Sequence, residues 1–238
     1  MAKFIIEKSL LVISSLGLKN QIYNIMKNRI TLTIALLATL FIASAQVIEV
    51  TPSYGYQFGA RLGYGPNYIK MNGSDQFGAT IGVETYSGLM AEFTYLNMGS
   101  ELRIRDTFLA PSEQRLADIN LDWFLLGATK YFQTGKVKPF FGTGLGLVVA
   151  TPRNENQDLS TDNRPIVLNS QTRFGFSLKG GANFMISEVI GINLQGNLYF
   201  PVNWAGAYIG PGGIGISTGS TVILGGFSTG LVFRIDAD

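Results

Sequence analysis

Apolar and polar residues alternate with period two in several stretches of the chain after residue 52. In the clearest stretch, 190–200, Ile, Leu and Phe hold most even positions, whereas Gly, Asn and Gln hold most odd ones. Stretches 54–63 and 173–184 repeat the pattern. Because the side chains of a strand point alternately to its two faces, each stretch predicts a strand with one apolar and one polar face. The apolar spacing of three and four that a helix needs is missing from these stretches.

The same pattern predicts eight strands in total, near residues 54–63, 76–85, 88–98, 119–132, 137–150, 173–184, 190–200 and 221–235. Most have about the 9–11 residues that a tilted strand needs to cross a membrane. Short joins at 86–87, 134–136 and 187–189 alternate with long connections at 65–75, 99–118, 151–172 and 201–220. Transmembrane barrels place tight turns on one side and long loops on the other, which a soluble sandwich has no reason to do. We therefore predict an all-β fold, a transmembrane antiparallel up-and-down β-barrel of about eight strands.

Composition supports this prediction. Charged residues make up only 14% of the chain, which is too few to cover an ordinary globular surface, and there are 29 glycines. Outside 30–45, no apolar run approaches the ~20 residues of a transmembrane helix. The net charge is +2 with scattered basic residues, so no nucleic-acid partner is expected.

The first 45 residues have a different pattern. Basic residues at 27 and 29, an apolar stretch at 30–42 and Ala43-Ser44-Ala45 have the order of a secretory signal peptide with its cleavage site. A membrane anchor is the alternative, but the apolar stretch is short for one. We expect three parts: 1–25 is a leader or mis-assigned start, 26–45 is a cleaved signal peptide, and 46–238 is the barrel domain.

The parity of charged residues predicts which strand face points inward. An Arg or Lys on the lipid face costs about 2–4 kcal/mol at the bilayer midplane. Eight charged side chains are predicted to face the lumen because they lie on the less apolar parity of their strands: Arg61, Glu84, Glu92, Asp122, Lys130, Arg173, Lys179 and Arg234. The solvated face of a soluble sheet is the alternative. Eight strands leave a lumen that side chains can fill, so we expect a plugged polar core in which Glu92 pairs with Lys130.

Aromatic residues near the strand ends predict two girdles at the membrane interfaces. The outer girdle would contain Tyr64, Phe77, Tyr95, Trp123, Phe174 and Phe200, and the periplasmic one Tyr54, Tyr131, Phe184 and Phe233.

Three motifs link the chain to a known group of proteins: YGYQFG at 54–59, PFFGTGLG at 139–146 and TGLVFRI at 229–235. With these motifs, 46–238 resembles the small outer-membrane β-barrel families of Bacteroidetes-type bacteria, grouped as porin-like or outer-membrane-protein-A-like. The resemblance implies the outer membrane of a Gram-negative bacterium as the location. It also implies insertion by the barrel assembly machinery, whose recognition signal matches Gly230, Phe233 and Ile235, although the chain continues for three more residues. It implies no activity.

Catalytic chemistry has little support in the sequence. Barrel-fold proteases and phospholipases generally use histidine as a base, and this chain has neither histidine nor cysteine. The glycines at 142–146 lack the Lys-Ser/Thr of a phosphate-binding loop. Glu84 and Glu92 are better explained by ion pairing than by acid–base catalysis. We expect no enzyme, no cofactor and no metal site.

The long loops are the candidate functional parts. Trp204, Tyr208 and Ile209 are unusually apolar for a loop, which predicts either folding back over the barrel mouth or docking to a protein partner. The charged residues of the other loops are expected to face lipopolysaccharide and other outer-membrane lipids. Three functions remain open: a structural or ligand-binding barrel, a narrow porin-like channel for small solutes, and an accessory subunit of an export or uptake complex.

Overall fold

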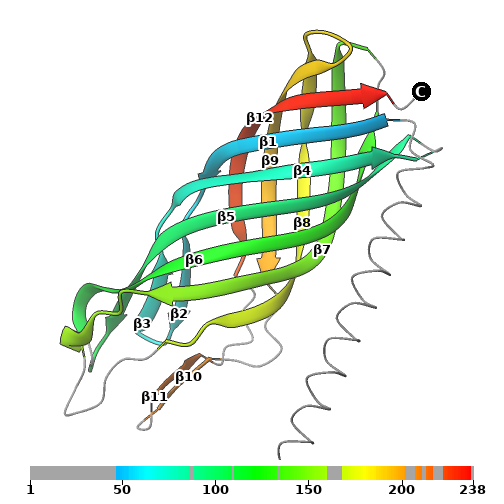
Figure 1. Cartoon of the computed structure of the whole chain (residues 1–238). Coiled ribbons are helices and arrows are strands. Elements are labelled where there is room, and N and C mark those ends of the chain that lie inside the picture. The colour runs from blue at the N-terminus through cyan, green and yellow to red at the C-terminus, as the bar shows by residue number, and fades with distance from the viewer. Residues whose placement is uncertain are drawn as a thin grey trace, which may run out of the picture. The chain divides into compact units, whose positions relative to one another are not determined.

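The computed structural model of the protein describes residues 47–85, 88–108, 110–132, 135–159, 168–201, 207–210, 213–216 and 222–236. Within these residues, ten strands form one antiparallel sheet (Figure 1). Eight of them make a closed ring: β1 (Val47–Gln57), β4 (Ser74–Glu84), β5 (Leu89–Asp106), β6 (Ala110–Tyr131), β7 (Val137–Arg153), β8 (Gln171–Met185), β9 (Ile190–Pro201) and β12 (Leu224–Asp236). The ring closes because β5 pairs with β6 and β12 pairs with β1. The predicted eight-stranded barrel is confirmed.

The two ends of the ring differ. The start of β1, the end of β12 and the three short connections lie at one end, which we call the turn end, and the longer connections lie at the other, the loop end (Figure 1). Gly88 and Gly135 in the short connections have φ values of 65° and 127°, where a side chain would be strained. The predicted alternation of short and long connections is therefore present.

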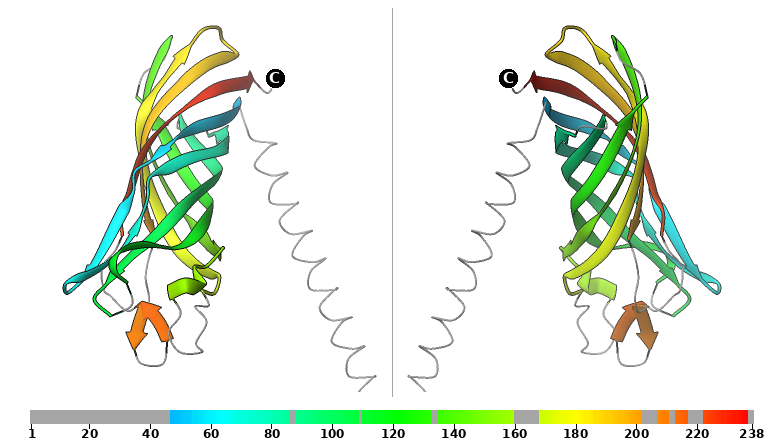
Figure 2. Two further views of the ribbon diagram at one scale, coloured as in Figure 1. Left: turned by 90° about the vertical axis from the view of Figure 1, so that its left-hand side faces the viewer. Right: turned by 90° about the vertical axis from the view of Figure 1, so that its right-hand side faces the viewer.

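Two predicted loops are partly strand. β2 (Ala60–Tyr64) and β3 (Asn67–Met71) form a hairpin that pairs with β5, and β5 and β6 continue together beyond the ring (Figure 2). We call β2, β3, 99–106 of β5 and 110–118 of β6 the flap. The sequence predicted loops at 65–75 and 99–118 as long connections between strands, but charged residues in these ranges alternate with apolar residues that cover a core, as in a half-buried strand.

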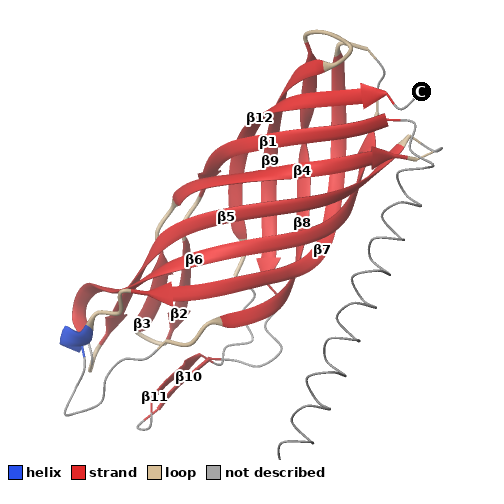
Figure 3. Ribbon diagram, viewed as in Figure 1, coloured by secondary structure: helices blue, strands red, loops and turns tan. Residues whose placement is uncertain are grey.

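Smaller elements occupy the other long connections. The 3₁₀ helix η1 (Gln157–Leu159) follows β7 at the loop end (Figure 3), and β10 (Ala207–Gly210) pairs with β11 (Gly213–Ile216). No helix in the described segments has the length and apolar character to span a membrane.

The two faces of the ring have reversed polarity relative to a soluble protein. Leu126 and Leu145 point outward and are each 69% exposed, whereas Gln57 and Gln76 point inward and are 0% and 1% exposed. Exposed apolar residues continue around the outer face on every strand of the ring. Such a surface suits contact with lipid and is unfavourable in water.

The closed ring leads to a first prediction. Because every ring strand has partners on both sides, the barrel should resist dodecyl sulfate at room temperature and unfold only on heating. An unheated sample is expected to migrate differently from a boiled sample on a denaturing gel. Identical migration of the two samples would contradict a closed ring.

Candidate functional site

The lumen near the turn end contains a polar cluster built from five ring strands. Arg234 of β12 donates to Glu84 of β4 with a distance of 2.6 Å between Nη2 and Oε2, and its Nη1 lies 3.9 Å from Oε2 of Glu49 on β1. Glu49 also accepts hydrogen bonds from the Tyr131 hydroxyl (2.7 Å) and Asn183 Nδ2 (3.2 Å). Each buried carboxylate therefore has a compensating partner, as a narrow lumen requires.

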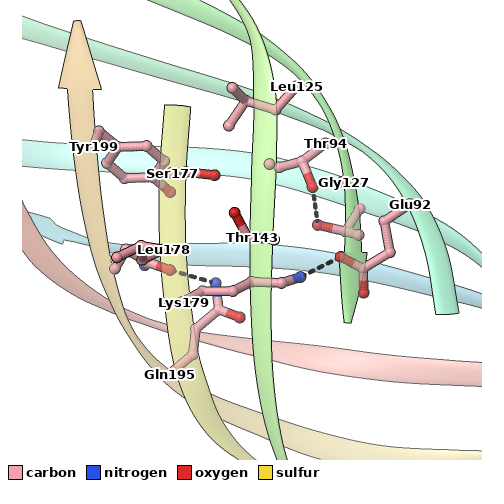
Figure 4. Close-up of a pocket in the computed structure, with 13 residues that line it drawn as sticks. Glu92, Thr94, Leu125, Gly127, Thr143, Ser177, Leu178, Lys179, Gln195 and Tyr199 are labelled. Atoms are coloured by element: carbon pink, nitrogen blue, oxygen red, sulfur yellow. Dashed lines mark hydrogen bonds and ion pairs between the residues drawn. The ribbon is translucent and has the colours of Figure 1, made fainter. Parts of the chain in front are cut away.

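The middle of the lumen is crossed by one ion pair. Lys179 Nζ on β8 lies 2.5 Å from Glu92 Oε2 on β5, and both side chains are largely buried (Figure 4). β6 and β7 separate these strands on one side of the ring, and four strands separate them on the other. The pair therefore bridges the lumen instead of lying along one wall.

The lumen near the loop end is closed by an apolar plug. The plug consists of Met71, Leu96, Met98, Leu121, Trp123, Leu125, Val148, Tyr199 and Leu224. The ring of Trp123, which is 1% exposed, lies 5.1 Å from that of Tyr199 between ring centroids. Gly175 makes room for the indole, since a Cβ at this position would lie 2.6 Å from its Cζ3. The sequence predicted a plugged polar core, whereas the loop-end part of the lumen is filled by apolar side chains.

Little free space remains between the plug and the turn end. Two cavities beside the Glu92–Lys179 pair have volumes of about 20 Å³ each. A cavity of this size holds about one water molecule. Residues from opposite walls line both cavities, so side chains fill most of the lumen at this level.

The predicted lumen charges fall into two groups. Glu84, Glu92, Lys179 and Arg234 lie in the lumen and are paired as described. Arg173 lies at the loop end of β8, on the inward parity, and its guanidinium donates to Gln171. Asp122, Lys130 and Arg61 lie on the outer face instead, so the prediction is wrong for these three residues.

The parity of β6 explains two of the corrections. Odd positions of this strand point inward, as the buried Leu121 and Trp123 show, so Asp122 and Lys130 point outward. Apolar residues occupy both odd and even positions of 119–132, so the two charged residues did not indicate which positions face the lumen. Asp122 is stabilised outside by the Tyr95 hydroxyl (2.8 Å) and Asn97 Nδ2 (2.7 Å). The expected pairing of Glu92 with Lys130 is also wrong, since the partner of Glu92 is Lys179.

A break between two strands explains the third correction. β1 ends at Gln57 and β2 begins at Ala60, so two residues separate them. Odd positions face inward in β1, whereas in β2 Ala60 packs against the plug and Arg61 is exposed. The predicted continuous strand at 54–63 therefore changes its facing at Phe58 and Gly59.

The aromatic girdles are partly different from the prediction. Trp123 belongs to the plug, Tyr131 belongs to the turn-end cluster, and Tyr64 packs against a core inside the flap. The outward residues Tyr54, Phe77, Phe174, Phe184 and Phe233 are exposed on the ring surface.

The remaining predicted residues lie in two places. Trp204 lies outside the described residues. Tyr208 and Ile209 belong to β10, of which the structure describes only the backbone. Gly230, Phe233 and Ile235 of the predicted assembly signal lie in β12, the last strand of the ring, with Phe233 and Ile235 on the outer face.

Sequence reasoning missed Glu49 and much of the flap. Residues 47–51 read VIEVT, and this alternation could have revealed that the first strand begins before residue 52. On the outer face of the flap, the Tyr68 hydroxyl donates to Glu113 Oε2 at 2.6 Å. This bond and the nearby Lys70, Arg103 and Arg61 lower the pKa of Glu113, although its desolvation acts in the opposite direction. The same bond raises the pKa of Tyr68.

Comparison with solved structures identifies the architecture. The outer membrane protein OprG of Pseudomonas aeruginosa is 12% identical with a TM-score of 0.58, covering 82% of this chain and 98% of its own. Neisserial surface protein A is 14% identical with a TM-score of 0.52, covering 80% of this chain and 98% of its own. No protein-family model matches the sequence, and no curated protein is significantly similar to it. The fold is that of the small outer-membrane β-barrels.

Proposed function

We propose that the protein is an integral barrel of the Gram-negative outer membrane, with a closed lumen and a structural or ligand-binding role at its loop end. The observation that carries this proposal is the combination of an apolar outer face with a filled lumen. A barrel of this kind acts through its exposed ends, because its interior offers no passage. The plug argues against the porin-like alternative, and no contact of the described residues favours the accessory-subunit alternative.

The orientation and assembly route belong to the same proposal. Outer-membrane barrels have short periplasmic turns and longer external loops, so the loop end would face the medium and contact lipopolysaccharide. Residues 26–45 would be removed as a signal peptide, and the barrel assembly machinery would recognise β12 through Gly230, Phe233 and Ile235. The membership in Bacteroidetes-type barrel families rests on the sequence resemblance.

A non-enzymatic role is proposed for the lumen carboxylates. Glu84 and Glu92 are each in an ion pair, and Glu49 accepts two hydrogen bonds. A general acid or base must reach a substrate, whereas these groups lie in a lumen without space for one. Their arrangement is that of structural ion pairing.

Conductance measurements test the closed lumen. Purified protein in planar lipid bilayers is expected to give no stepwise current above that of the bare bilayer, because the plug and the Glu92–Lys179 pair lie in series. A known porin serves as the control for the bilayer, and the gel shift on heating verifies that the barrel is folded. Reproducible current steps from folded protein would reject the closed barrel in favour of the channel.

A further inference from the structure

A row of four basic residues crosses the outer face of the flap at a single level. Arg61 of β2 lies opposite Lys70 of β3, Lys70 lies opposite Arg103 of β5, and Arg103 lies opposite Arg115 of β6. The inner face of the flap is covered by a separate apolar core of Ile69, Ile104, Ala110, Leu116 and Leu159. Like charges directly opposite each other destabilise a sheet, so this row requires anions beside it.

Carboxylates of the flap neutralise only one half of the row. Arg103 Nε lies 3.1 Å from Glu113 and 3.5 Å from Glu101, and Arg115 Nη2 lies 2.8 Å from Asp118. Among the described residues, Arg61 and Lys70 form no salt bridge. The guanidinium of Arg61 instead lies 3.7 Å above the centre of the Tyr68 ring, and Tyr68 is fixed by its hydrogen bond to Glu113. Arg61 is therefore held against the Tyr68 ring, and no described residue accepts a hydrogen bond from Arg61 or from the adjacent Lys70.

These two cations border a hollow on the outer surface. The hollow has a volume of about 620 Å³ and is lined by residues of β1, β2, β3, β6 and the β3–β4 turn, among them Tyr56, Arg61, Lys70 and Glu113. Its volume is within the range of small-molecule sites. Glu113 already forms a salt bridge with Arg103 and accepts a hydrogen bond from Tyr68. The charges of Arg61 and Lys70 therefore give the hollow a net positive charge.

The hollow adjoins an apolar surface. Tyr56 also belongs to an aromatic cluster with Phe58 and Phe227, whose ring centroids are 6.0 to 6.4 Å apart. All three side chains point outward and are exposed. Arg61 follows Phe58 by only three residues, so the chain separates their Cα atoms by at most about 11 Å. A cationic hollow thus lies directly beyond the edge of the lipid-facing band, at the level where headgroups are expected.

We infer that this hollow binds the phosphorylated headgroup of an anionic lipid of the outer leaflet, with Arg61 and Lys70 on the phosphate and the Tyr56–Phe58–Phe227 cluster against the acyl chains. This inference rests on the proposed outer-membrane location. A guanidinium presents paired donors that match phosphate oxygens, and an adjacent ammonium adds a point charge. The phosphate offsets the repulsion between Arg61 and Lys70. The aromatic cluster selects a lipid over a soluble anion, because only a lipid carries chains to cover it.

Lipid retention by the purified barrel tests this inference. Detergent-solubilised protein is titrated with bisphosphorylated lipid A, and the bound lipid is counted by native mass spectrometry. The double variant Arg61→Gln, Lys70→Gln is expected to bind at least about tenfold more weakly, since it loses two charge-assisted contacts. The variant Arg61→Lys, Lys70→Arg keeps both charges and should bind more tightly than the double Gln variant. Unmodified protein should bind dephosphorylated lipid as weakly as the double Gln variant binds lipid A.

A matched control removes two charges at the opposite end of the barrel. Lys130→Gln, Lys136→Gln should leave lipid A binding unchanged, and the gel shift on heating confirms that each variant is folded. Equal binding by the double Gln variant and the unmodified protein would overturn the inference, as would an equal loss in the control. Inorganic phosphate that displaces lipid A at equal concentration would show a soluble-anion site and would also overturn it. The conductance measurement does not depend on lipid binding. A failure of the lipid-binding inference is therefore distinguishable from a failure of the proposed closed lumen.

Discussion

Replacement of Glu92 by Gln is expected to lower the free energy of unfolding of the barrel by about 3–5 kcal/mol, because it leaves the Lys179 ammonium buried without its counter-ion. The ammonium lies in the lumen at 2.5 Å from the carboxylate and has two cavities beside it with room for about one water each. Replacement of Lys179 by Met should cost a similar amount by leaving Glu92 unpaired. Urea unfolding of the protein from lipid vesicles measures both effects.

The double variant separates the pair from its surroundings. Glu92→Gln with Lys179→Met should cost less than the sum of the two single changes, since the second change removes the charge that the first left unpaired. Lys130→Met is the matched control, because Lys130 is exposed on the outer face and its change should add to Glu92→Gln without coupling. Coupling of Glu92 to Lys130 and additivity with Lys179 would show that the facing of β6 is wrong.

The contrast between Lys130 and Lys179 shows what the sequence could predict. Period-two alternation predicted the strands, the ring and the inward position of Glu92, because each follows from local residue order. A partner across the lumen depends on how the ring closes and on its stagger, which no local pattern contains. The sequence therefore predicts Lys130 on the adjacent strand as the partner of Glu92, although the actual partner, Lys179, lies three strands away.

The sequence did not predict the flap or the plug, because the patterns of both segments fit more than one structure. Residues 99–106 belong to a predicted long loop and carry charges at 101, 103 and 105, yet Leu102 and Ile104 between them cover an inner core. In 119–132, apolar residues occupy both parities, so the side chains that fill the lumen could not be told from those that face lipid. Trp123 was consequently predicted to lie in the outer girdle. Strand pairing resolved both cases, since it fixes which neighbours each side chain meets.

Truncation of Trp123 to Ala should be the most damaging change in the loop-end half of the lumen. The indole is 1% exposed, packs on Tyr199 and occupies space that Gly175 leaves free. Loss of a buried aromatic side chain is expected to cost about 3–5 kcal/mol and to leave a cavity. Trp123→Phe should recover part of that stability. Urea unfolding from lipid vesicles measures both variants.

The same variant tests how the lumen is closed. Trp123→Ala alone is expected to stay silent in planar bilayers, because the Glu92–Lys179 pair still bridges the lumen beyond the plug. Combining it with Glu92→Gln and Lys179→Met removes both barriers, and ion current should appear. The matched control combines Phe124→Ala with Glu92→Gln and Lys179→Met. It should give no current, since Phe124 points outward and is 41% exposed. Current from Trp123→Ala alone would show that the plug is the sole barrier, and current from the Phe124 control would exclude the plug as a barrier.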